Sequence, residues 1–340
     1  MTGIAIIIIR RIGIVMNYFV TGGAGFIGSH LIERLLADHH RVWCLDNFND
    51  YYSPALKWQN IESARSHPNF TLIQGDILDE PLLTEIFQTQ AFDGIIHLAA
   101  RAGVRPSVQQ PKLYEEVNIR GTLNLLEIAR TFQIQKFVMA SSSSVYGNNS
   151  KVPFSESDPV DQPISPYAAT KKAAELIGYT YHKLYDISVT CLRFFTVYGP
   201  RQRPDMAIHK FTRLIAEGNE IPIYGNGSAQ RDFTFISDII DGVMRSIERC
   251  QGYHIYNLGD SRVVSLRQLI HLIETALGKT ARIKWLPPQP GDVSITYADI
   301  RKANQDLGYQ PLVSIEDGIT AFVHWFHQHR HHLTDNVWHE

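Results

Sequence analysis

The stretch TGGAGFIG at residues 21–28 decides the fold, because it ends a short apolar run at residues 18–21 and opens a segment of helical period. Its glycines, Gly22, Gly25 and Gly28, fall where a tight turn, the close approach of backbone to a pyrophosphate and the packing of helix on strand each exclude a β-carbon. The N-terminus of such a helix offers N–H groups and the positive end of a dipole to phosphate. Strand, turn and helix together predict a dinucleotide-binding βαβ unit.

One acidic residue indicates which dinucleotide binds. Asp46 ends the second apolar run, about 20 residues beyond the glycines, where a carboxylate bonds the ribose hydroxyls of adenosine. It would repel the extra phosphate of NADP, and no arginine stands in the four residues after it. We therefore expect NAD. The other cofactor contacts expected here are Phe26, Ile27, Asn47, Asp76 and Ile77, with a strand-end cap as an equally good role for Asp76.

Beyond Asn17 the chain alternates short apolar runs with segments of helical period, the pattern of a parallel sheet built from βαβ units. Six strands are predicted at residues 18–21, 42–46, 71–74, 94–99, 137–141 and 189–194, and helices at 118–132, 166–185 and 265–277. The expected fold is α/β, a doubly wound parallel sheet of the Rossmann type with a smaller, partly interleaved C-terminal substrate domain. We assign residues 1–16 to a leader of uncertain status, 17–195 to the NAD-binding domain and 196–340 mainly to the substrate domain.

The composition excludes several classes of protein. Apolar residues make up 44% of the 340 residues, charged residues 19%, and the formal net charge is -2, so we expect an ordered enzyme without affinity for nucleic acid. The three cysteines are widely spaced, which favours reduced side chains and a cytoplasmic location over a disulfide frame. Five histidines gather at residues 324–332 without a Cys, Asp or Glu among them, so we expect no metal site.

The first 16 residues carry an apolar run at residues 4–9, which Arg10 and Arg11 interrupt. A bilayer span needs about 20 apolar residues, so we expect no stable insertion in a membrane. The run also lacks the cleavage site of a secretory signal. We interpret it as an extension upstream of a start at Met16, with a weak interfacial anchor as the alternative.

Tyr167 and Lys171 stand four residues apart in a predicted helix, so they share one helix face. A free tyrosine has a pKa of about 10, but a neighbouring cation and a positive nicotinamide both favour the phenolate, which can act as a general base. The run SSSSVYG at residues 141–147 ends the fifth strand, at the sheet edge where such folds bind ligands. Ser142 can hold there the substrate oxygen whose proton Tyr167 removes.

On these residues, the chain from Asn17 to about Tyr309 resembles the extended short-chain dehydrogenase/reductase family and, within it, the UDP-sugar 4-epimerases. The resemblance implies Tyr167, Lys171 and Ser142 for catalysis, and Ala99, Ala100, Asn118 and again Lys171 for the nicotinamide half of the cofactor. For Asn118 a simple polar contact of the helix is the alternative.

The reaction implied by the resemblance is 4-epimerisation of a UDP-hexose. Tyr167 would remove the C4 hydroxyl proton while hydride passes to NAD, and the 4-keto sugar would turn over before the hydride returns. Dehydratase relatives carry acidic side chains where Ser143 and Ser144 precede Val-Tyr-Gly here, so elimination of water is disfavoured. Decarboxylation of UDP-glucuronate and a non-catalytic NAD-binding scaffold are further alternatives, although scaffolds usually lack the Tyr and Lys pair.

The substrate residues are also carried over by resemblance. Those implied for UDP are Thr196, Tyr224, Arg231 and Asp292, with Arg231 as a guanidinium clamp on the diphosphate or, alternatively, a surface ion pair. The loop GPRQRPDMA at residues 199–207 resembles that of UDP-glucuronate 4-epimerases, as do residues 49–54 and 102–105. Arg203, with Ser143 and Ser144, would bind the sugar carboxylate. Arg201 and Gln202 replace a tryptophan-glycine pair common there, so UDP-glucose or UDP-N-acetylglucosamine is the alternative substrate.

The predicted helices at residues 118–132 and 166–185 resemble the pair through which relatives dimerise as a four-helix bundle. We therefore expect a homodimer. A UDP-sugar is the expected small-molecule partner.

Overall fold

The computed structural model describes residues 14–287 and 293–333. Within these residues the centre is a seven-stranded parallel sheet in the order β10-β6-β5-β4-β1-β2-β3. Its strands are β1 (Asn17–Thr21), β2 (Arg41–Asp46), β3 (Phe70–Gln74), β4 (Gly94–His97), β5 (Lys136–Ser142), β6 (Ser188–Phe194) and β10 (Tyr253–Leu258). The strand order reverses between β1 and β4, and ligands of such sheets bind at the carboxyl ends of the strands beside this switch point.

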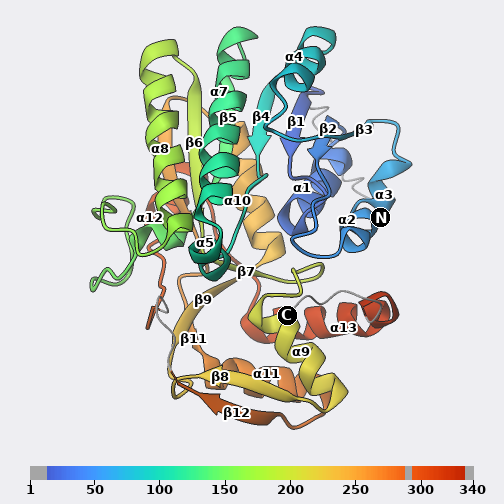
Figure 1. Cartoon of the computed structure of the whole chain (residues 1–340), viewed down its shortest axis with the longest axis vertical. Helices are drawn as coiled ribbons and strands as arrows, with labels where there is room; N and C mark the ends of the chain where they lie inside the picture. Colours follow the sequence, from blue (N-terminus) through green and yellow to red (C-terminus); the bar gives the residue numbers. More distant parts are fainter. Residues whose placement is uncertain (1–13, 288–292, 334–340) are drawn as a thin grey trace, which may run out of the picture.

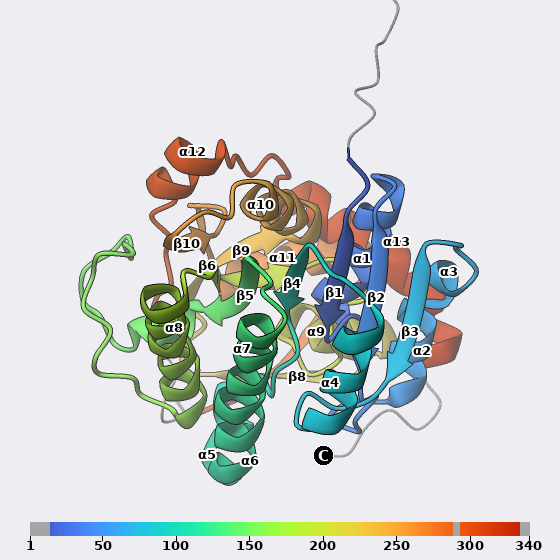
Figure 2. The same cartoon turned by 90° about the horizontal axis from the view of Figure 1, so that it is seen from above.

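Helices cover both faces of the sheet (Figure 1, Figure 2). One face carries α4 (Glu80–Thr89), α7 (Gly121–Thr131) and α8 (Pro166–Tyr185), and the other carries α1 (Phe26–Ala37), α10 (Ile236–Glu248) and α12 (Arg301–Leu307). Neighbouring side chains of β1 point to opposite faces, so Phe19 packs in the core with Leu125 of α7 while Val20 packs in the core with Leu31 of α1. The short helices of this part are α2 (Pro54–Asn60), α3 (Glu62–Arg65), α5 (Val104–Gln109), α6 (Pro111–Glu115) and η2 (Ser143–Tyr146).

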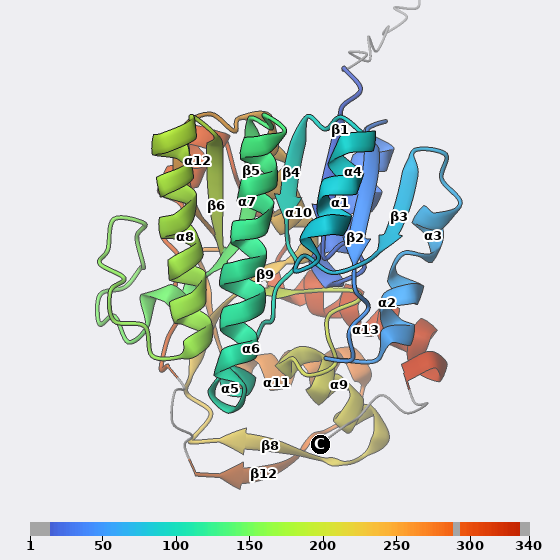
Figure 3. The ribbon, with the colours of Figure 1, turned by 45° about the horizontal axis from the view of Figure 1, so that its top comes forward.

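A smaller unit lies beyond the carboxyl ends of the strands (Figure 3). It contains a three-stranded sheet of β7 (Thr196–Tyr198), β9 (Gln230–Phe235) and β11 (Val263–Ser265), and a parallel pair of β8 (Glu220–Tyr224) and β12 (Arg282–Leu286). Its helices are α9 (Ala207–Glu217), α11 (Leu266–Leu277) and α13 (Ile315–Leu333). A separate apolar core holds the unit together, with Phe211, Ile221, Leu269 and Phe322 fully or almost fully buried.

The chain passes between the two units more than once. After β9 it returns to the large sheet as α10 and β10, then builds β11, α11 and β12 in the smaller unit, and packs α12 against β10. The α/β class, the doubly wound parallel sheet and the interleaving are therefore confirmed. The division of function at residue 195 stays a prediction.

Three expectations differ in detail. The strand expected at residues 94–99 ends at His97, whose ring bonds Thr21 at 2.8 Å and Thr122 at 3.0 Å, so Ala99 and Ala100 belong to the loop that follows. The helix expected at residues 118–132 is α7 preceded by a π-helical turn, η1 (Glu116–Arg120). The edge strand β10 was missing from the six predicted strands.

None of the described helices is long and apolar enough to cross a bilayer. Cys44, Cys191 and Cys250 are buried and unpaired. The described residues contain no group of three or more His, Cys, Asp or Glu placed to hold a metal ion. Residues 1–13, which include most of the expected leader, lie outside the described residues.

Candidate active site

The glycine turn lies between β1 and α1, at the switch point of the sheet. Gly22 has a φ of +71°, and a β-carbon there would lie 2.6 Å from the backbone nitrogen of Ala99. A β-carbon on Gly28 would lie 2.3 Å from the carbonyl oxygen of Gly22. Gly25 caps α1 without a side-chain hydrogen bond, so no side chain of the cap competes for the N–H groups of the first turn. This cradle fits the pyrophosphate of a dinucleotide.

Asp46 lies beside this turn at the end of β2. Its carboxylate oxygens accept backbone N–H bonds from Ala24 at 3.0 Å and from Phe48 at 2.9 Å. Burial raises the pKa of the Asp46 carboxyl, and the two N–H bonds act in the opposite direction. Each oxygen keeps further lone pairs for a ribose hydroxyl. The Asn47 amide donates to the Asp76 carboxylate at 2.7 Å. This hydrogen bond links two more of the residues predicted to bind the cofactor.

The loop at residues 99–103, which follows β4, forms one wall of the site. Tyr51 and Tyr114 both donate their hydroxyls to the carbonyl oxygen of Ala102, at 2.7 and 2.6 Å. Asn118 accepts the N–H of Arg101 at 2.8 Å and donates to its carbonyl oxygen at 3.0 Å. The Asn118 amide is therefore engaged with the loop backbone, and it acts on the site through this wall.

Tyr167, Ser142 and Lys171 come together at the carboxyl end of β5. Ser165 caps the first turn of α8 with its side chain, which fixes the start of the helix that carries Tyr167 and Lys171. The Ser142 hydroxyl donates to the Ser144 hydroxyl at 3.1 Å, and both serines line the same cavity as Tyr167. Lys171 donates from Nζ to the carbonyl oxygen of Ala140 at 2.8 Å.

Burial sets the charge of both helix residues. It raises the pKa of the Tyr167 phenol, while the hydrogen bond to Ser142 and the charge of Arg203 lower it in part. Burial also lowers the pKa of Lys171 to about 8, against the attraction of Glu175. Both shifts disfavour the charged forms, so a further positive charge, such as that of an oxidised nicotinamide, is what favours the phenolate.

A buried ion pair fixes the elements behind these residues. Glu175, one turn beyond Lys171 on α8, receives two hydrogen bonds of 2.8 Å from the guanidinium of Arg193 on β6. The same carboxylate accepts the hydroxyl of Ser141 at 2.7 Å. Both charged side chains are almost wholly buried. One carboxylate therefore ties α8, β5 and β6 together behind Tyr167 and Lys171.

Arg203 provides a cation in the same cavity as Tyr167. Its guanidinium makes two hydrogen bonds of 2.9 Å with Asp205 and lies 5.3 Å from the ring centre of Tyr51. Burial acts to lower the pKa of the guanidinium, but the charge of Asp205 and, to a smaller extent, Tyr51 and Tyr52 raise this pKa above its usual value. The side chain is about one-fifth exposed, and it lines the same cavity as Tyr167.

These groups line one cavity of about 480 Å³. The predicted residues that line it are Gly22, Gly25, Phe26, Ile27, Gly28, Asp46, Asn47, Asp76, Ile77, Ala99, Ala100, Ser142, Ser143, Ser144, Tyr167, Lys171, Thr196 and Arg203. The predicted residues Asn118, Tyr224 and Arg231 are not among its lining residues. Tyr224 lies under the guanidinium of Arg105, and Arg231 donates from Nη1 to the carbonyl oxygen of Gln230 at 2.8 Å. Asp292 lies outside the described residues.

Sequence reasoning assigned no role to three further lining residues, Tyr51, Lys57 and Arg101. Tyr51 touches both the loop after β4 and Arg203. Lys57 is buried, donates to the carbonyl oxygen of Asn49 at 2.7 Å, and has its pKa lowered by burial to about 8. The motif at residues 49–54 contains Tyr51 but neither Lys57 nor Arg101, and the contacts of Tyr51 depend on how distant segments meet.

The sequence matches the family model of GDP-mannose 4,6 dehydratase over residues 19–322. The UDP-glucuronate 4-epimerase of Thermodesulfobacterium geofontis is 46% identical over 309 residues, which cover 91% of this chain and 95% of that relative. The UDP-glucuronic acid 4-epimerase from Bacillus cereus in complex with UDP-glucuronic acid and NAD superimposes with a TM-score of 0.87 at 38% identity, over 92% of this chain and 99% of that one. The UDP-glucose 4-epimerase from Thermotoga maritima with UDP-glucose gives a TM-score of 0.86 at 33% identity, with the same coverage.

Proposed function

Since the chain belongs to the GDP-mannose 4,6 dehydratase family, within the extended short-chain dehydrogenases/reductases, we infer that it is an NAD-dependent UDP-sugar 4-epimerase. It interconverts UDP-glucuronate and UDP-galacturonate. The observation that carries this inference is one cavity lined by the glycine turn, by Tyr167, Ser142 and Lys171, and by Arg203. The cavity thus combines a dinucleotide cradle, a proton acceptor and a cation for a carboxylate.

We propose that Tyr167 is the general base. NAD, held by the glycine turn and Asp46, would supply the hydride acceptor and donor for C4 of the sugar. Tyr167 takes the proton of the C4 hydroxyl as the 4-keto sugar forms and gives it back when the alcohol is restored. Ser142 hydrogen-bonds the same oxygen and holds it next to the phenol. Lys171, fixed by the carbonyl of Ala140, favours the phenolate when charged and binds the nicotinamide ribose.

Arg203 is the proposed partner of the sugar carboxylate. Its two bonds to Asp205 orient the guanidinium plane, and the Tyr51 ring supports it from one face. Ser143 and Ser144 line the same cavity and offer hydroxyl donors to the same carboxylate. Among the remaining proposed substrate residues, Thr196 lines the cavity, and Tyr224, Arg231 and Asp292 are proposed for UDP.

UDP-glucose is the second candidate substrate. The observation in its favour is that Asp205 already neutralises Arg203, which reduces the attraction of this cation for a second carboxylate. The similarity to a UDP-glucose 4-epimerase supports the same alternative. UDP-N-acetylglucosamine is the further neutral sugar to test.

The test is to incubate the purified protein separately with UDP-glucuronate, UDP-glucose and UDP-N-acetylglucosamine and to separate the 4-epimers by chromatography. We expect conversion of UDP-glucuronate to its 4-epimer; conversion of the neutral sugars alone would assign the enzyme to the second candidate. Release of a pentose nucleotide or accumulation of a 4-keto product would indicate decarboxylation or dehydration instead.

The base is tested by Tyr167→Phe, which should lower kcat by at least about 100-fold, because general base catalysis contributes that much or more. NAD content should be unchanged, since the phenol is not part of the dinucleotide cradle. Tyr179→Phe is the matched control, because Tyr179 lies on the same helix, does not line the cavity, and keeps its aromatic ring as phenylalanine. An active Tyr167→Phe enzyme would remove the proposed base.

We also propose a homodimer formed by α7 and α8, which pack side by side and would make a four-helix bundle with those of a second copy. The support is a set of large apolar side chains exposed on these two helices: Leu123, Leu176, Tyr179, Leu184 and Tyr185. Leu176→Glu should convert the dimer to a monomer in light scattering after gel filtration. Leu312→Glu, at an exposed leucine outside these helices, is the control. A wild-type monomer would disprove the proposal.

The proposed function also implies roles for the two domains and a location in the cell. We propose that residues 17–195 bind NAD and carry the catalytic residues, and that residues 196–340 mainly bind the UDP-sugar. We propose a cytoplasmic location, which the three buried, unpaired cysteines support. Fluorescence from a tagged chain would test the location directly.

A further inference from the structure

His97, the last residue of β4, is a buried polar residue to which the proposed reaction gives no role. It lies in the middle of the large sheet, paired in register with Thr21 of β1 and with Met139 of β5. Its side chain is 4% exposed and does not line the active-site cavity. A buried polar side chain is normally held by hydrogen bonds, so its partners show which elements it joins.

Three hydrogen bonds fix which ring nitrogen of His97 carries the hydrogen. The Thr122 hydroxyl donates its one hydrogen to the carbonyl oxygen of Asn118 at 2.6 Å, so its oxygen can only accept from His97. Nε2 of His97 lies 3.0 Å from that oxygen and is therefore the donor. In a neutral imidazole the other nitrogen accepts, so Nδ1 accepts the Thr21 hydroxyl at 2.8 Å. His97 thus bonds two elements, as a donor to one and an acceptor from the other.

The ring of His97 is neutral, which keeps these two roles distinct. Burial, together with the positive charge of Lys171, lowers the pKa of His97 to about 3. A protonated ring would donate from both nitrogens, and the Thr21 hydroxyl could then no longer give its hydrogen to Nδ1. The neutral ring also adds no second positive charge near Lys171.

The bond to Thr21 connects His97 with the cofactor cradle. Thr21 is the last residue of β1 and directly precedes Gly22. Because its hydroxyl hydrogen goes to His97, its oxygen can accept, and it accepts the N–H of Ala99 at 3.3 Å. A β-carbon on Gly22 would lie 2.6 Å from the same Ala99 nitrogen, so the loop after β4 touches the glycine turn here. His97 therefore acts on the contact between this loop and the cradle.

The bond to Thr122 connects His97 with the helix that carries Tyr167. Thr122 holds the carbonyl oxygen of Asn118 in the π-helical turn η1. The Asn118 amide donates to the Thr170 hydroxyl at 3.0 Å, and this hydroxyl donates to the carbonyl oxygen of Tyr167 at 2.9 Å. Asn118, Thr122 and Thr170 are each at most 5% exposed. Short π-helical turns are rare and occur often at functional sites, which fits a turn that holds α8 in place.

We propose that His97 is a positioning residue, whose Nε2–H tautomer fixes the first turn of α8, and with it Tyr167, relative to the glycine turn and the loop at residues 99–103. The two bonds have separate effects. The bond to Thr21 supports the binding of NAD, and the bond to Thr122 supports proton transfer by Tyr167. The second effect rests on the proposed epimerase function, whereas the first does not. His97 does not line the active-site cavity, so it acts only through these partners.

Two variants of His97 separate the two bonds, because an asparagine amide reaches the place of Nδ1 and a glutamine amide reaches the place of Nε2. His97→Asn keeps an acceptor for Thr21 and loses the donor to Thr122. We expect its kcat to fall about 10- to 100-fold with NAD affinity little changed, since a small misplacement of a reacting group has an effect of this size. His97→Gln keeps the donor to Thr122 and loses the acceptor for Thr21. We expect its NAD affinity in fluorescence titration to fall roughly two- to tenfold, with kcat at saturating NAD little changed.

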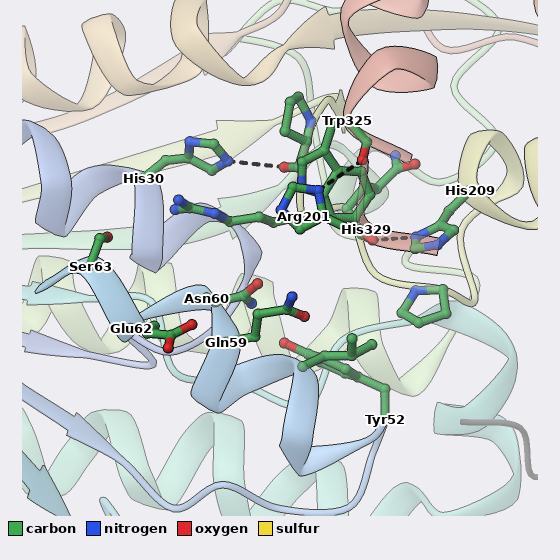
Figure 4. Close-up of a pocket in the computed structure, with 14 residues that line it drawn as sticks. His30, Tyr52, Gln59, Asn60, Glu62, Ser63, Arg201, His209, Trp325 and His329 are labelled. Carbon is green, nitrogen blue, oxygen red and sulfur yellow. Dashed lines mark hydrogen bonds between the residues drawn. The ribbon is translucent and has the colours of Figure 1, made fainter. Parts of the chain in front are cut away.

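The matched control is His209→Asn. His209 is buried like His97, and burial lowers its pKa to about 4, but it lies at a second cavity, of about 430 Å³, that no residue proposed for catalysis lines (Figure 4). Its Nδ1 donates to the carbonyl oxygen of Gln202 at 2.6 Å, and asparagine keeps a donor at that place. We expect this variant to lower the Tm only. If both His97 variants lose kcat and NAD affinity together, or lose neither per folded molecule, His97 only fills the core and the proposal is wrong.

The tautomer of His97 is tested without any activity assay, by ¹⁵N NMR of the full-length protein labelled at histidine. The His97 signals are those missing from the spectrum of His97→Gln. We expect hydrogen on Nε2 alone from about pH 8 to about pH 5, because the pKa at which the ring gains a second proton is about 3. Hydrogen on Nδ1 in this range would overturn the proposal. A wild type inactive on every UDP-sugar would disprove the epimerase function, and the NMR and NAD measurements would still decide the role of His97.

Discussion

Replacing Arg203 by methionine tests the choice of sugar most directly. The side chain lines the cavity with Tyr167 and carries the cation proposed for the carboxylate. A hydrogen bond to a charged group contributes about 1.5–3 kcal/mol, which corresponds to a fall in kcat/KM of about 10- to 150-fold. UDP-glucose has a hydroxymethyl group in place of the carboxylate, so its kcat/KM should fall by less, and only because loss of the Arg203 charge raises the pKa of Tyr167.

The assay measures initial rates of epimer formation with each sugar nucleotide for the wild type and for Arg203→Met. Arg262→Met is a matched control, because Arg262 makes an equivalent two-bond pair with Asp260, at 2.7 and 2.8 Å, and does not line the cavity. Asp205→Asn should have the opposite effect to Arg203→Met and lower the KM for UDP-glucuronate, because it removes the competing carboxylate. Equal losses for both sugars in Arg203→Met, or no loss for UDP-glucuronate, would refute the assignment of Arg203.

The remaining predictions concern the cofactor cradle and the buried lysine. Asp46→Asn should weaken NAD binding by about 10- to 100-fold, measured by fluorescence titration, because one oxygen that accepts from the cofactor and the backbone becomes an amide donor. Gly28→Ala should lower the free energy of unfolding by about 1–3 kcal/mol in urea, and by more than Gly25→Ala, because the new methyl group would lie 2.3 Å rather than 3.2 Å from the carbonyl oxygen of Gly22. Lys171 loses its proton near pH 8 in the folded state but only near 10.5 when unfolded, so the unfolded state binds more protons between these values and stability rises with pH. From pH 8 to 10 the unfolding free energy of the wild type should therefore rise by roughly 1–2 kcal/mol relative to Lys171→Met, and a flat difference would contradict the buried ammonium.

The large sheet could be predicted because local patterns define it. The glycines at residues 22, 25 and 28 fix the first turn, and buried parallel strands appear as continuous apolar runs. The edge strand β10 was missed because its sequence, YHIYNL, mixes polar and apolar residues and follows a segment with the texture of the smaller unit. The strand expected to reach Ala99 stops at His97, because the chain turns there to form the wall above Gly22. Local sequence does not report such tertiary packing.

In the candidate site too, contacts within one helix could be predicted from the sequence, whereas contacts between distant segments could not. Tyr167 and Lys171 are close because they stand four positions apart in one helix, so their spacing alone predicted that they share a face. Tyr51 and Arg203 are distant in sequence, and their contact depends on how the loop after β2 meets the loop before α9. The pairing of Arg203 with Asp205 lies within five residues of sequence, yet it required the backbone conformation of the loop to be known. Tyr224 and Arg231 were assigned by resemblance, and the fold places them outside the cavity lining.

The buried Glu175 carboxylate limits which residues can be varied to change the sugar specificity of this enzyme. This carboxylate accepts hydrogen bonds from Arg193 and Ser141 on two strands, and it lies one turn from Lys171. Substitutions of Glu175 should therefore unfold the protein before they could change its substrate. The loop at residues 199–206 has no such buried ion pair, since its pairs of Arg201 with Glu33 and of Arg203 with Asp205 are partly exposed. A mutant library that varies the loop at residues 199–206 and keeps Glu175 should therefore contain more folded variants.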